Sequence, residues 1–159
     1  MPDKLLPPTL RIGRSRTGLG LFSLETIRRG TLISEYVGER ISNDEADQRR
    51  SKYLFEVSSR TTIDGAAKGN LARYINHSCK PNAHAEIRRG RVFIYADRRI
   101  EPGDEITYNY GRNYFRSIIE PLGCRCVPCE STRRPRKIAA DRPRKAANTN
   151  RISRSAKAG

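Results

Sequence analysis

The sequence predicts a mostly β protein, and three observations support this fold class. Seven segments of four to eight residues are rich in Ile, Val, Leu, Phe and Tyr and are separated by turn residues: TLRIGRS, GLFSLE, TLISEYVG, YLFEV, TTID, HAEIRR and RVFIYAD. The stretch EIRRGRVFIYAD predicts a hairpin that turns near Gly90, and Pro-Gly at 102–103 predicts a turn between two apolar segments. Helix signals are confined to one stretch.

That stretch is SNDEADQRRSK, residues 42–52. Ser42 followed by Glu45 is a capping-box pattern, with acids in the first turn and bases in the last. The pattern predicts a helix of about three turns, the length of an ordinary short helix. Because almost no apolar face is present, we expect a solvated surface element.

Charge is concentrated at the C-terminal end of the 159-residue chain, which carries a net charge of +15. Residues 131–159 contain ten Lys and Arg, one Asp and no aromatic residue, so we expect a disordered tail. The tail repeats RPRK around Lys137 and Lys145. We expect it to bind DNA or RNA phosphates, with a purely solubilising role as the alternative.

The sequence also predicts an intracellular protein without a membrane span. No apolar run approaches the length of a transmembrane helix, and MPDKLLPPTL does not have the pattern of a secretory signal. The length predicts one domain, and we expect a monomer.

The four cysteines suggest a metal site. Three of them lie in CRCVPC as Cys124, Cys126 and Cys129, and a tetrahedral zinc site needs a fourth ligand. Cys79 is the only other thiol, so we predict one zinc ion held by four cysteines. His77 as the fourth ligand and unligated thiols remain as alternatives.

Two further motifs decide nothing when each is taken alone. TGLGLF contains a single Gly-x-Gly, which is more often a tight turn than a cofactor loop. DEITYNY places Tyr108 and Tyr110 two residues apart, so they would share one face of a strand.

The order of the motifs is more informative than any one of them. GLGLF, EYVGE, ARYINHSCKPNA, PGDEITYNYG and CRCVPC together resemble the SET-domain protein lysine methyltransferases that carry a post-SET cysteine segment, over about residues 9–129. The resemblance implies a SET (β-clip-like) fold of short sheets, with a pseudoknot and few short helices. It divides the chain into an N-terminal extension (1–8), a SET domain (9–123), a post-SET zinc-binding segment (124–130) and the basic tail (131–159).

The resemblance also implies roles for individual residues. Tyr110 would be the catalytic tyrosine, Tyr36 would sit between cofactor and lysine, and Tyr108 would limit the room around the amine. The residues implied to bind S-adenosylmethionine are Thr17, Gly18, Leu19, Gly20, Tyr36, Arg73, Tyr74, Asn76, His77 and Tyr110. Tyr114 or Phe115 would close the lysine channel, since no aromatic residue follows Cys129.

The implied function is methylation of a lysine in a basic protein, a histone or histone-like protein, mainly to the mono- or dimethyl state. The implied compartment is the nucleus and chromosome in a eukaryote, or the cytoplasm and nucleoid in a prokaryote. We also expect automethylation at Lys137 or Lys145. The alternative is a catalytically inactive, zinc-stabilised SET-like protein that binds nucleic acid or chromatin.

Overall fold

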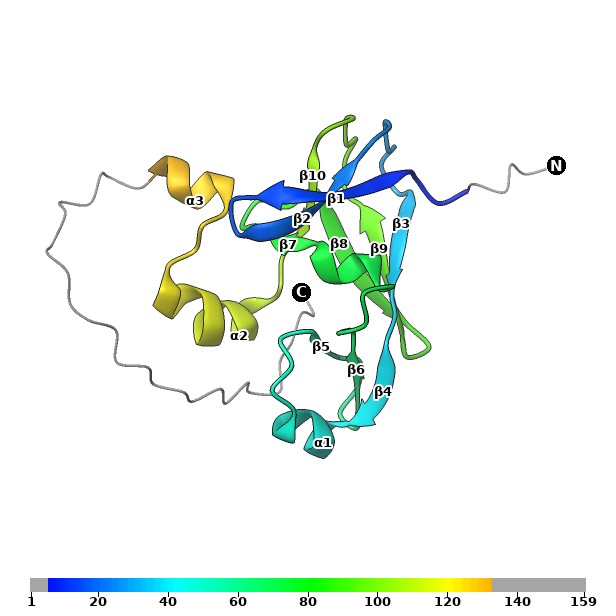
Figure 1. Ribbon diagram of the computed structural model, residues 1–159, viewed down its shortest axis with the longest axis vertical. Coiled ribbons are helices and arrows are strands. Elements are labelled where there is room, and N and C mark those ends of the chain that lie inside the picture. The colour runs from blue at the N-terminus through cyan, green and yellow to red at the C-terminus, as the bar shows by residue number, and fades with distance from the viewer. Residues whose placement is uncertain (1–5, 133–159) are drawn as a thin grey trace, which may run out of the picture.

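Two sheets of short strands organise residues 6–132, which are the residues that this computed structural model describes (Figure 1). The larger sheet has the order β1 (Leu10–Ser15), β2 (Gly18–Ser23), β10 (Glu105–Tyr108), β8 (Ala83–Arg88), β9 (Arg91–Ala96) and β3 (Leu32–Tyr36). The short strand β7 (Asn76–His77) pairs with β10. The smaller sheet has the order β4 (Glu39–Ser42), β6 (Thr61–Asp64) and β5 (Leu54–Glu56).

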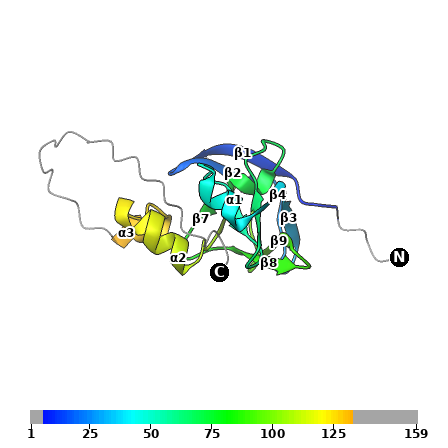
Figure 2. The same cartoon turned by 90° about the horizontal axis from the view of Figure 1, so that it is seen from below.

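The helices in this part of the chain are all short. They are α1 (Asn43–Gln48), the 3₁₀ turn η1 (Leu71–Tyr74), α2 (Arg112–Tyr114), the π-helical turn η2 (Phe115–Ile119), the 3₁₀ turn η3 (Glu120–Leu122) and α3 (Val127–Thr132). The segment that carries α2 and α3 lies to one side of the sheets in both views (Figures 1 and 2). The prediction of a mostly β fold with few short helices is confirmed.

The predicted hairpin is present. Strands β8 and β9 pair in antiparallel register, and Arg88 opposite Arg91 is the last pair before the turn. The two turn residues both have positive φ, 50° at Arg89 and 72° at Gly90, as a two-residue hairpin with the native twist requires. At the Pro-Gly turn, Gly103 has a φ of 90°, which favours glycine.

The predicted helix is half as long as expected. Its start is as predicted, since the Ser42 hydroxyl accepts a hydrogen bond from the Glu45 backbone N–H at 3.1 Å. Its end is not, because Arg49 has extended backbone (φ −77°, ψ 135°) and the helix stops at Gln48. The three-turn prediction is therefore wrong. Arg49, at which the helix ends, instead pairs with Glu39 of β4 and Asp64 of β6.

The helix is also less solvated than its sequence suggests. Asn43 and Ala46 are buried, and Ala46 forms a small apolar cluster with Ile41 and Leu54 of the smaller sheet. In so short a helix, the single small side chain of Ala46 is enough to pack one face against the sheet. The Asn43 amide is satisfied there by the Thr62 hydroxyl, which donates to its Oδ1 at 2.8 Å.

The main core lies between the strands of the larger sheet and the neighbouring segments. Its fully buried aliphatic side chains each contribute about 1.5–3 kcal/mol on burial. They include Leu21, Ile33, Ile75, Ile94 and Ile106. Two tyrosines, Tyr36 and Tyr108, are also fully buried here, which is unusual for a residue with a polar hydroxyl.

The two ends of the chain lie partly outside the described residues. The N-terminal extension is described from Leu6 onward, and Lys137 and Lys145 fall in the undescribed residues 133–159. Ser131 and Thr132, which the sequence analysis assigns to the tail, are the last residues of α3. Within residues 6–132, no helix combines the length and hydrophobicity needed to cross a bilayer.

Candidate active site

The pairing of β7 with β10 brings the predicted cofactor and catalytic residues together. The two strands run parallel, with Asn76 opposite Thr107 and His77 opposite Tyr108. Just beyond the pair, the Tyr110 backbone N–H donates to Nδ1 of His77 at 3.1 Å. The NHSC and TYNY segments are thus packed against each other, as the expected pseudoknot requires.

A group of tyrosines extends from this junction into the core. The ring centroids of Tyr108 and Tyr110 are 4.9 Å apart, and those of Tyr110 and Tyr114 are 5.2 Å apart at 80°. The Tyr36 hydroxyl donates to the backbone oxygen of Tyr53 at 2.7 Å. The Tyr110 hydroxyl donates to the backbone oxygen of Ile75 at 2.5 Å. Tyr53 belongs to none of the sequence motifs, and only the fold brings it to Tyr36.

Burial keeps these hydroxyls protonated. It raises the pKa of Tyr108 and of Tyr110 well above the ordinary value, with a smaller contribution from neighbouring tyrosines. Burial also raises the pKa of Tyr36, and the charge of Asp64 adds to the effect. These tyrosines can therefore donate and accept hydrogen bonds at neutral pH, but they cannot serve there as anionic bases.

Tyr108 differs from the other two in one respect. Its hydroxyl is buried and has no hydrogen-bond partner among residues 6–132. A buried polar atom without a partner costs about 1–3 kcal/mol. The hydroxyl therefore lowers the stability of the ligand-free protein, and it is free to bond a ligand that reaches it.

We expect Tyr108→Phe to raise the free energy of unfolding by about 1 kcal/mol at pH 7, because it removes an unsatisfied buried hydroxyl. Tyr36→Phe is the matched control and should lower it by about 1 kcal/mol, because it removes one of the two hydrogen bonds that the Tyr53 carbonyl accepts, the other coming from the Gly65 backbone N–H. Denaturant titrations of both variants measure these changes. A Tyr108→Phe protein less stable than the parent would contradict this account.

The pH dependence of the same variant has a definite sign. A pKa raised in the folded state gives stability that is present below the unfolded value of about 10 and is lost as the pH rises beyond it. The parent should therefore lose stability above about pH 10, and Tyr108→Phe should lose about 1.4 kcal/mol less per pH unit.

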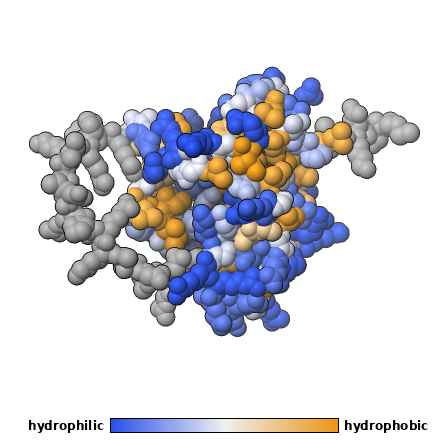
Figure 3. All heavy atoms as spheres, in the orientation of Figure 1, coloured by the Kyte–Doolittle hydropathy of each residue, from blue (hydrophilic) through white to orange (hydrophobic). Residues whose placement is uncertain are grey.

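A cavity of about 230 Å³ lies beside the tyrosines. Four of the predicted cofactor residues line it: Thr17, Asn76, His77 and Tyr110. Its other walls come mainly from the segment 114–126, where apolar side chains also gather at the surface (Figure 3). An apolar wall with a few polar groups at one edge fits a ligand with a heterocyclic base and an amino-acid end, as S-adenosylmethionine has.

The other predicted cofactor residues do not line this cavity. Gly18, Leu19 and Gly20 lie in β2, where the Leu19 carbonyl accepts a hydrogen bond from the Asn76 side chain at 3.0 Å. Arg73 donates to the backbone oxygen of Ala66. The Arg73 guanidinium carbon lies 4.0 Å from the Tyr53 ring centroid and 5.2 Å from that of Tyr74. Arg73 thus holds η1 in place beside the NHSC segment.

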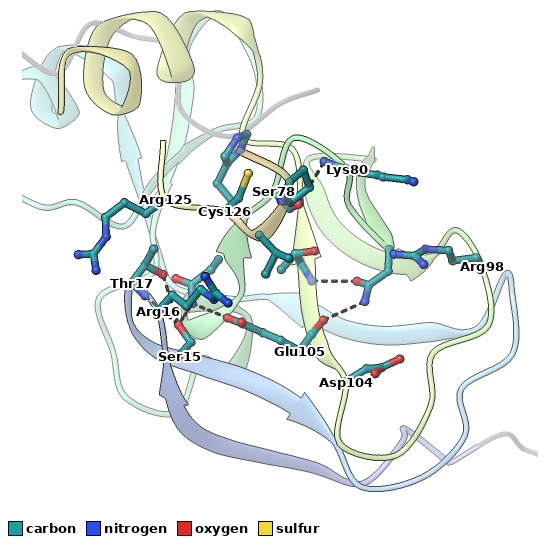
Figure 4. A pocket seen from close by; sticks show the side chains of 16 residues that line it. Ser15, Arg16, Thr17, Ser78, Lys80, Arg98, Asp104, Glu105, Arg125 and Cys126 are labelled. Atoms are coloured by element: carbon teal, nitrogen blue, oxygen red, sulfur yellow. Dashed lines mark hydrogen bonds between the residues drawn. The ribbon is translucent and has the colours of Figure 1, made fainter. Parts of the chain in front are cut away.

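A second cavity of about 460 Å³ adjoins the first and shares five lining residues with it: Thr17, Asn76, His77, Arg125 and Cys126 (Figure 4). Its walls come from the β1–β2 hairpin, β10 and the cysteine segment. Both cations and carboxylates line it, with Lys80 and Arg98 on one side and Asp104 and Glu105 below (Figure 4). The two cavities adjoin at Asn76 and His77 of β7, and we refer to them together as the cleft.

The four cysteines meet at the end of this cleft. Their Sγ atoms all lie within 4.8 Å of one another, with Cys79 at 3.8 Å from Cys124 and 3.5 Å from Cys129. A tetrahedral zinc site with Zn–S bonds of about 2.3 Å has sulfur atoms about 3.8 Å apart. The arrangement therefore fits a four-thiolate zinc site, in spite of the short Cys-x-Cys-x2-Cys spacing.

His77 lies beside the cysteine cluster and outside its group of ligand atoms. Since Nδ1 accepts the Tyr110 N–H, a neutral ring carries its proton on Nε2, which is 3.4 Å from Cys79 Sγ. Burial lowers the pKa of His77, which favours that neutral ring. The imidazole therefore connects a cysteine of the cluster to the backbone of Tyr110.

The segment 35–47 contains five acidic residues, and arginines of other segments pair with three of them. Glu39 and Glu45 both bind the Arg49 guanidinium, at 2.7 and 2.6 Å. The same guanidinium lies 3.1 Å from Asp64, and Glu35 pairs with Arg91. The pairing of Arg49 with these carboxylates could not be predicted from the sequence, because its partners come from three separate elements.

Known proteins resemble this chain over most of its described length. The model of the SET domain matches residues 18–111. Histone-lysine N-methyltransferase set1 of Dictyostelium discoideum is 40% identical over 126 residues, which cover 71% of this chain and 8% of that protein. The H3 lysine-4 specific histone-lysine N-methyltransferase of Schizosaccharomyces pombe is 39% identical over 131 residues, 74% of this chain and 14% of that protein.

A solved structure agrees with these relatives. A chain from the crystal structure of an active polycomb repressive complex 2 in the stimulated state matches with a TM-score of 0.64 and 33% identity, over 71% of this chain and 16% of that one. This chain thus spans only a small part of the proteins that it resembles. Because the family model covers more than half of the sequence, the chain belongs to the SET domain family.

Proposed function

We propose that this chain is an S-adenosylmethionine-dependent protein-lysine N-methyltransferase that acts on a lysine of a basic protein, with histones and histone-like proteins as candidate substrates. One observation carries the proposal: the β7–β10 pair sets the cleft lined by Asn76 and His77 directly against the Tyr110 cluster. The relatives named as histone-lysine N-methyltransferases support it.

The cleft residues would hold the methyl donor. Thr17 and Asn76 offer polar groups for its amino-acid end, and the apolar wall that includes Ile118 and Ile119 suits its base. When bound, S-adenosylmethionine supplies a methyl group on a cationic sulfur. Cys79, Cys124, Cys126 and Cys129 would hold one zinc ion with a structural role at the end of the cleft.

The tyrosine cluster would prepare the lysine for attack. An amine with a pKa near 10.4 is only about 0.04% neutral at pH 7, and only the neutral amine is a nucleophile. Buried aromatic walls disfavour the ammonium form by desolvation, so the proton is released to water. The Tyr36 and Tyr110 hydroxyls each donate a hydrogen bond to a backbone carbonyl, so each hydroxyl oxygen can accept an N–H of the amine and orient the amine lone pair.

With S-adenosylmethionine in the cleft as the source of the methyl group, Tyr36 and Tyr110 would hold the amine nitrogen so that its lone pair faces that methyl group. Tyr108 would limit how far the reaction repeats. Its unpartnered hydroxyl can hold a water or the amine, which leaves less room for a methylated nitrogen to turn.

We therefore expect the parent enzyme to make mainly mono- and dimethyl-lysine, and Tyr108→Phe to shift the products toward a higher methylation state. Calorimetry with S-adenosylmethionine comes first, followed by methyl transfer to histone-tail peptides read by mass spectrometry. Trimethyl-lysine as the main initial-rate product of the parent would contradict the proposed product limit. A chain that binds nucleic acid but neither binds the donor nor transfers methyl groups would support the inactive SET-like alternative.

The same assay addresses the basic tail. The tail is proposed to bind DNA or RNA and to be methylated at Lys137 or Lys145 in its RPRK repeats. Peptide mapping after incubation with labelled donor detects automethylation, and an unlabelled tail would exclude it under those conditions. We further propose that the chain is a monomer and that it works on chromatin or nucleoid proteins.

A further inference from the structure

The Asn76 side chain is fixed by a contact that the proposed mechanism does not use. Its Nδ2 lies 3.0 Å from Ser15 Oγ, 3.0 Å from the Leu19 carbonyl and 2.7 Å from Oε1 of Glu105. An amide nitrogen has only two protons to donate. Glu105 is the shortest of the three contacts and the only charged acceptor, so it is the strongest partner.

Glu105 also determines the orientation of the Asn76 side-chain amide, that is, on which side its nitrogen and its oxygen lie. A carboxylate and a backbone carbonyl can only accept, so the nitrogen of the amide must face Glu105 and Leu19. The opposite orientation would set the amide oxygen against a negative charge. The polar atom of Asn76 left for a ligand in the cleft is therefore Oδ1, an acceptor.

The Glu105 carboxylate also lies close against the β1–β2 hairpin, beside Gly20. A Cβ on Gly20 would lie 2.5 Å from Glu105 Oε1 and 3.0 Å from the Ser15 Cβ, so a side chain there would displace the Glu105 carboxylate. Glu105 sits in β10 opposite Phe22 of β2, and its side chain reaches toward Ser15 (Figure 4). The carboxylate thus fills the space that glycine leaves open and joins the hairpin to Asn76.

Glu105 is not occupied by an ion pair. Among residues 6–132, no Lys or Arg nitrogen lies within 4.0 Å of its carboxylate, whereas Glu35, Glu39 and Glu86 each have an arginine partner. The carboxylate is therefore committed to the Asn76 amide rather than to a cation.

We propose that Glu105 is a positioning residue of the cofactor site. It orients the Asn76 side-chain amide so that Oδ1 faces the cleft, where this oxygen can accept a hydrogen bond from the ammonium group of an amino-acid-type ligand. This inference rests on the proposed function, because it assumes that S-adenosylmethionine binds in this cleft. It names Glu105, which lines the larger of the two cavities and acts on the bound cofactor through the Asn76 amide.

Removing the carboxylate should weaken cofactor binding without removing the catalytic group. For Glu105→Ala we expect the Kd for S-adenosylmethionine, measured by calorimetry on the full chain, to rise about 10- to 100-fold, the effect typical of a hydrogen bond to a charged group. At saturating donor, kcat and the KM for a lysine peptide should stay within about twofold. Glu105→Gln keeps an acceptor oxygen and should restore part of the affinity. Glu86→Ala, which removes an exposed carboxylate from β8, is the matched control.

A double-mutant cycle distinguishes positioning from a general loss of stability. In an Asn76→Ala background, Glu105→Ala should have almost no further effect on the Kd. An additive effect, or a Glu105→Ala protein that binds the donor like the parent, would overturn the inference while leaving the proposed function intact. A parent that binds no donor would instead overturn both.

A readout without cofactor tests the contact itself. The side-chain NH₂ resonances of Asn76 should shift in Glu105→Ala but not in Glu86→Ala. Unchanged resonances would show that Glu105 does not hold the amide, whatever the donor affinity.

Discussion

Replacing Tyr110 with phenylalanine is expected to lower kcat by at least about a hundredfold, because the enzyme loses the oxygen that orients the attacking amine. In the structure, the Tyr110 hydroxyl donates to the Ile75 carbonyl, and its ring lies 4.9 Å from Tyr108 and 5.2 Å from Tyr114. The variant keeps the ring and these packing contacts. Its defect should therefore appear in methyl transfer more than in folding.

Two measurements distinguish a loss of catalysis from a loss of cofactor binding or a general effect of removing a tyrosine hydroxyl. Calorimetry should find the Kd for S-adenosylmethionine within a fewfold of the parent value, since the Tyr110 backbone N–H still donates to His77. Tyr95→Phe, at a surface tyrosine of β9 that stacks on His84, should leave kcat unchanged. A Tyr110→Phe enzyme with more than a tenth of the parent kcat would remove Tyr110 from the mechanism.

The strands could be predicted from the sequence because their signals are local. Each of the seven apolar segments overlaps a strand, whereas β4, β7 and β10 lie outside these segments, and the turn follows from Gly90, which tolerates positive φ. The end of α1 could not be predicted in this way. It depends on Arg49, which binds Glu39 of a preceding strand and Asp64 of a later one.

The residues of the candidate site also differ in whether local sequence could predict them. The order of the motifs indicated Asn76, His77 and Tyr110, and the fold brings them into one cleft. The same reasoning passed over Glu105, whose local sequence PGDEI reads as the end of a turn. Its role appears only when β10 enters the sheet beside β2 and β7, which brings a residue 29 positions away to Asn76.

Replacing Cys79 with serine is expected to remove the metal and to weaken cofactor binding at least about tenfold. The fold gives the physical link: Cys79 contacts His77 at 3.4 Å, and His77 accepts the backbone N–H of Tyr110. His77 lines both cavities of the cleft. Without a thiolate at position 79, the imidazole loses its partner on the cluster side, and the wall that faces the donor is no longer held.

The same change should lower thermal stability, because a metal present at a thousand times its Kd stabilises the folded state by about 4 kcal/mol. Elemental analysis should find about one zinc ion per parent chain and much less in the variant. Parent protein stripped with a chelator should match Cys79→Ser in both melting temperature and cofactor Kd, whereas Ser78→Ala in the same loop should keep its metal. If the stripped parent binds S-adenosylmethionine as tightly as the metal-loaded protein, the expectation is wrong. The metal would then hold the C-terminal segment in place without affecting the position of His77 in the cleft.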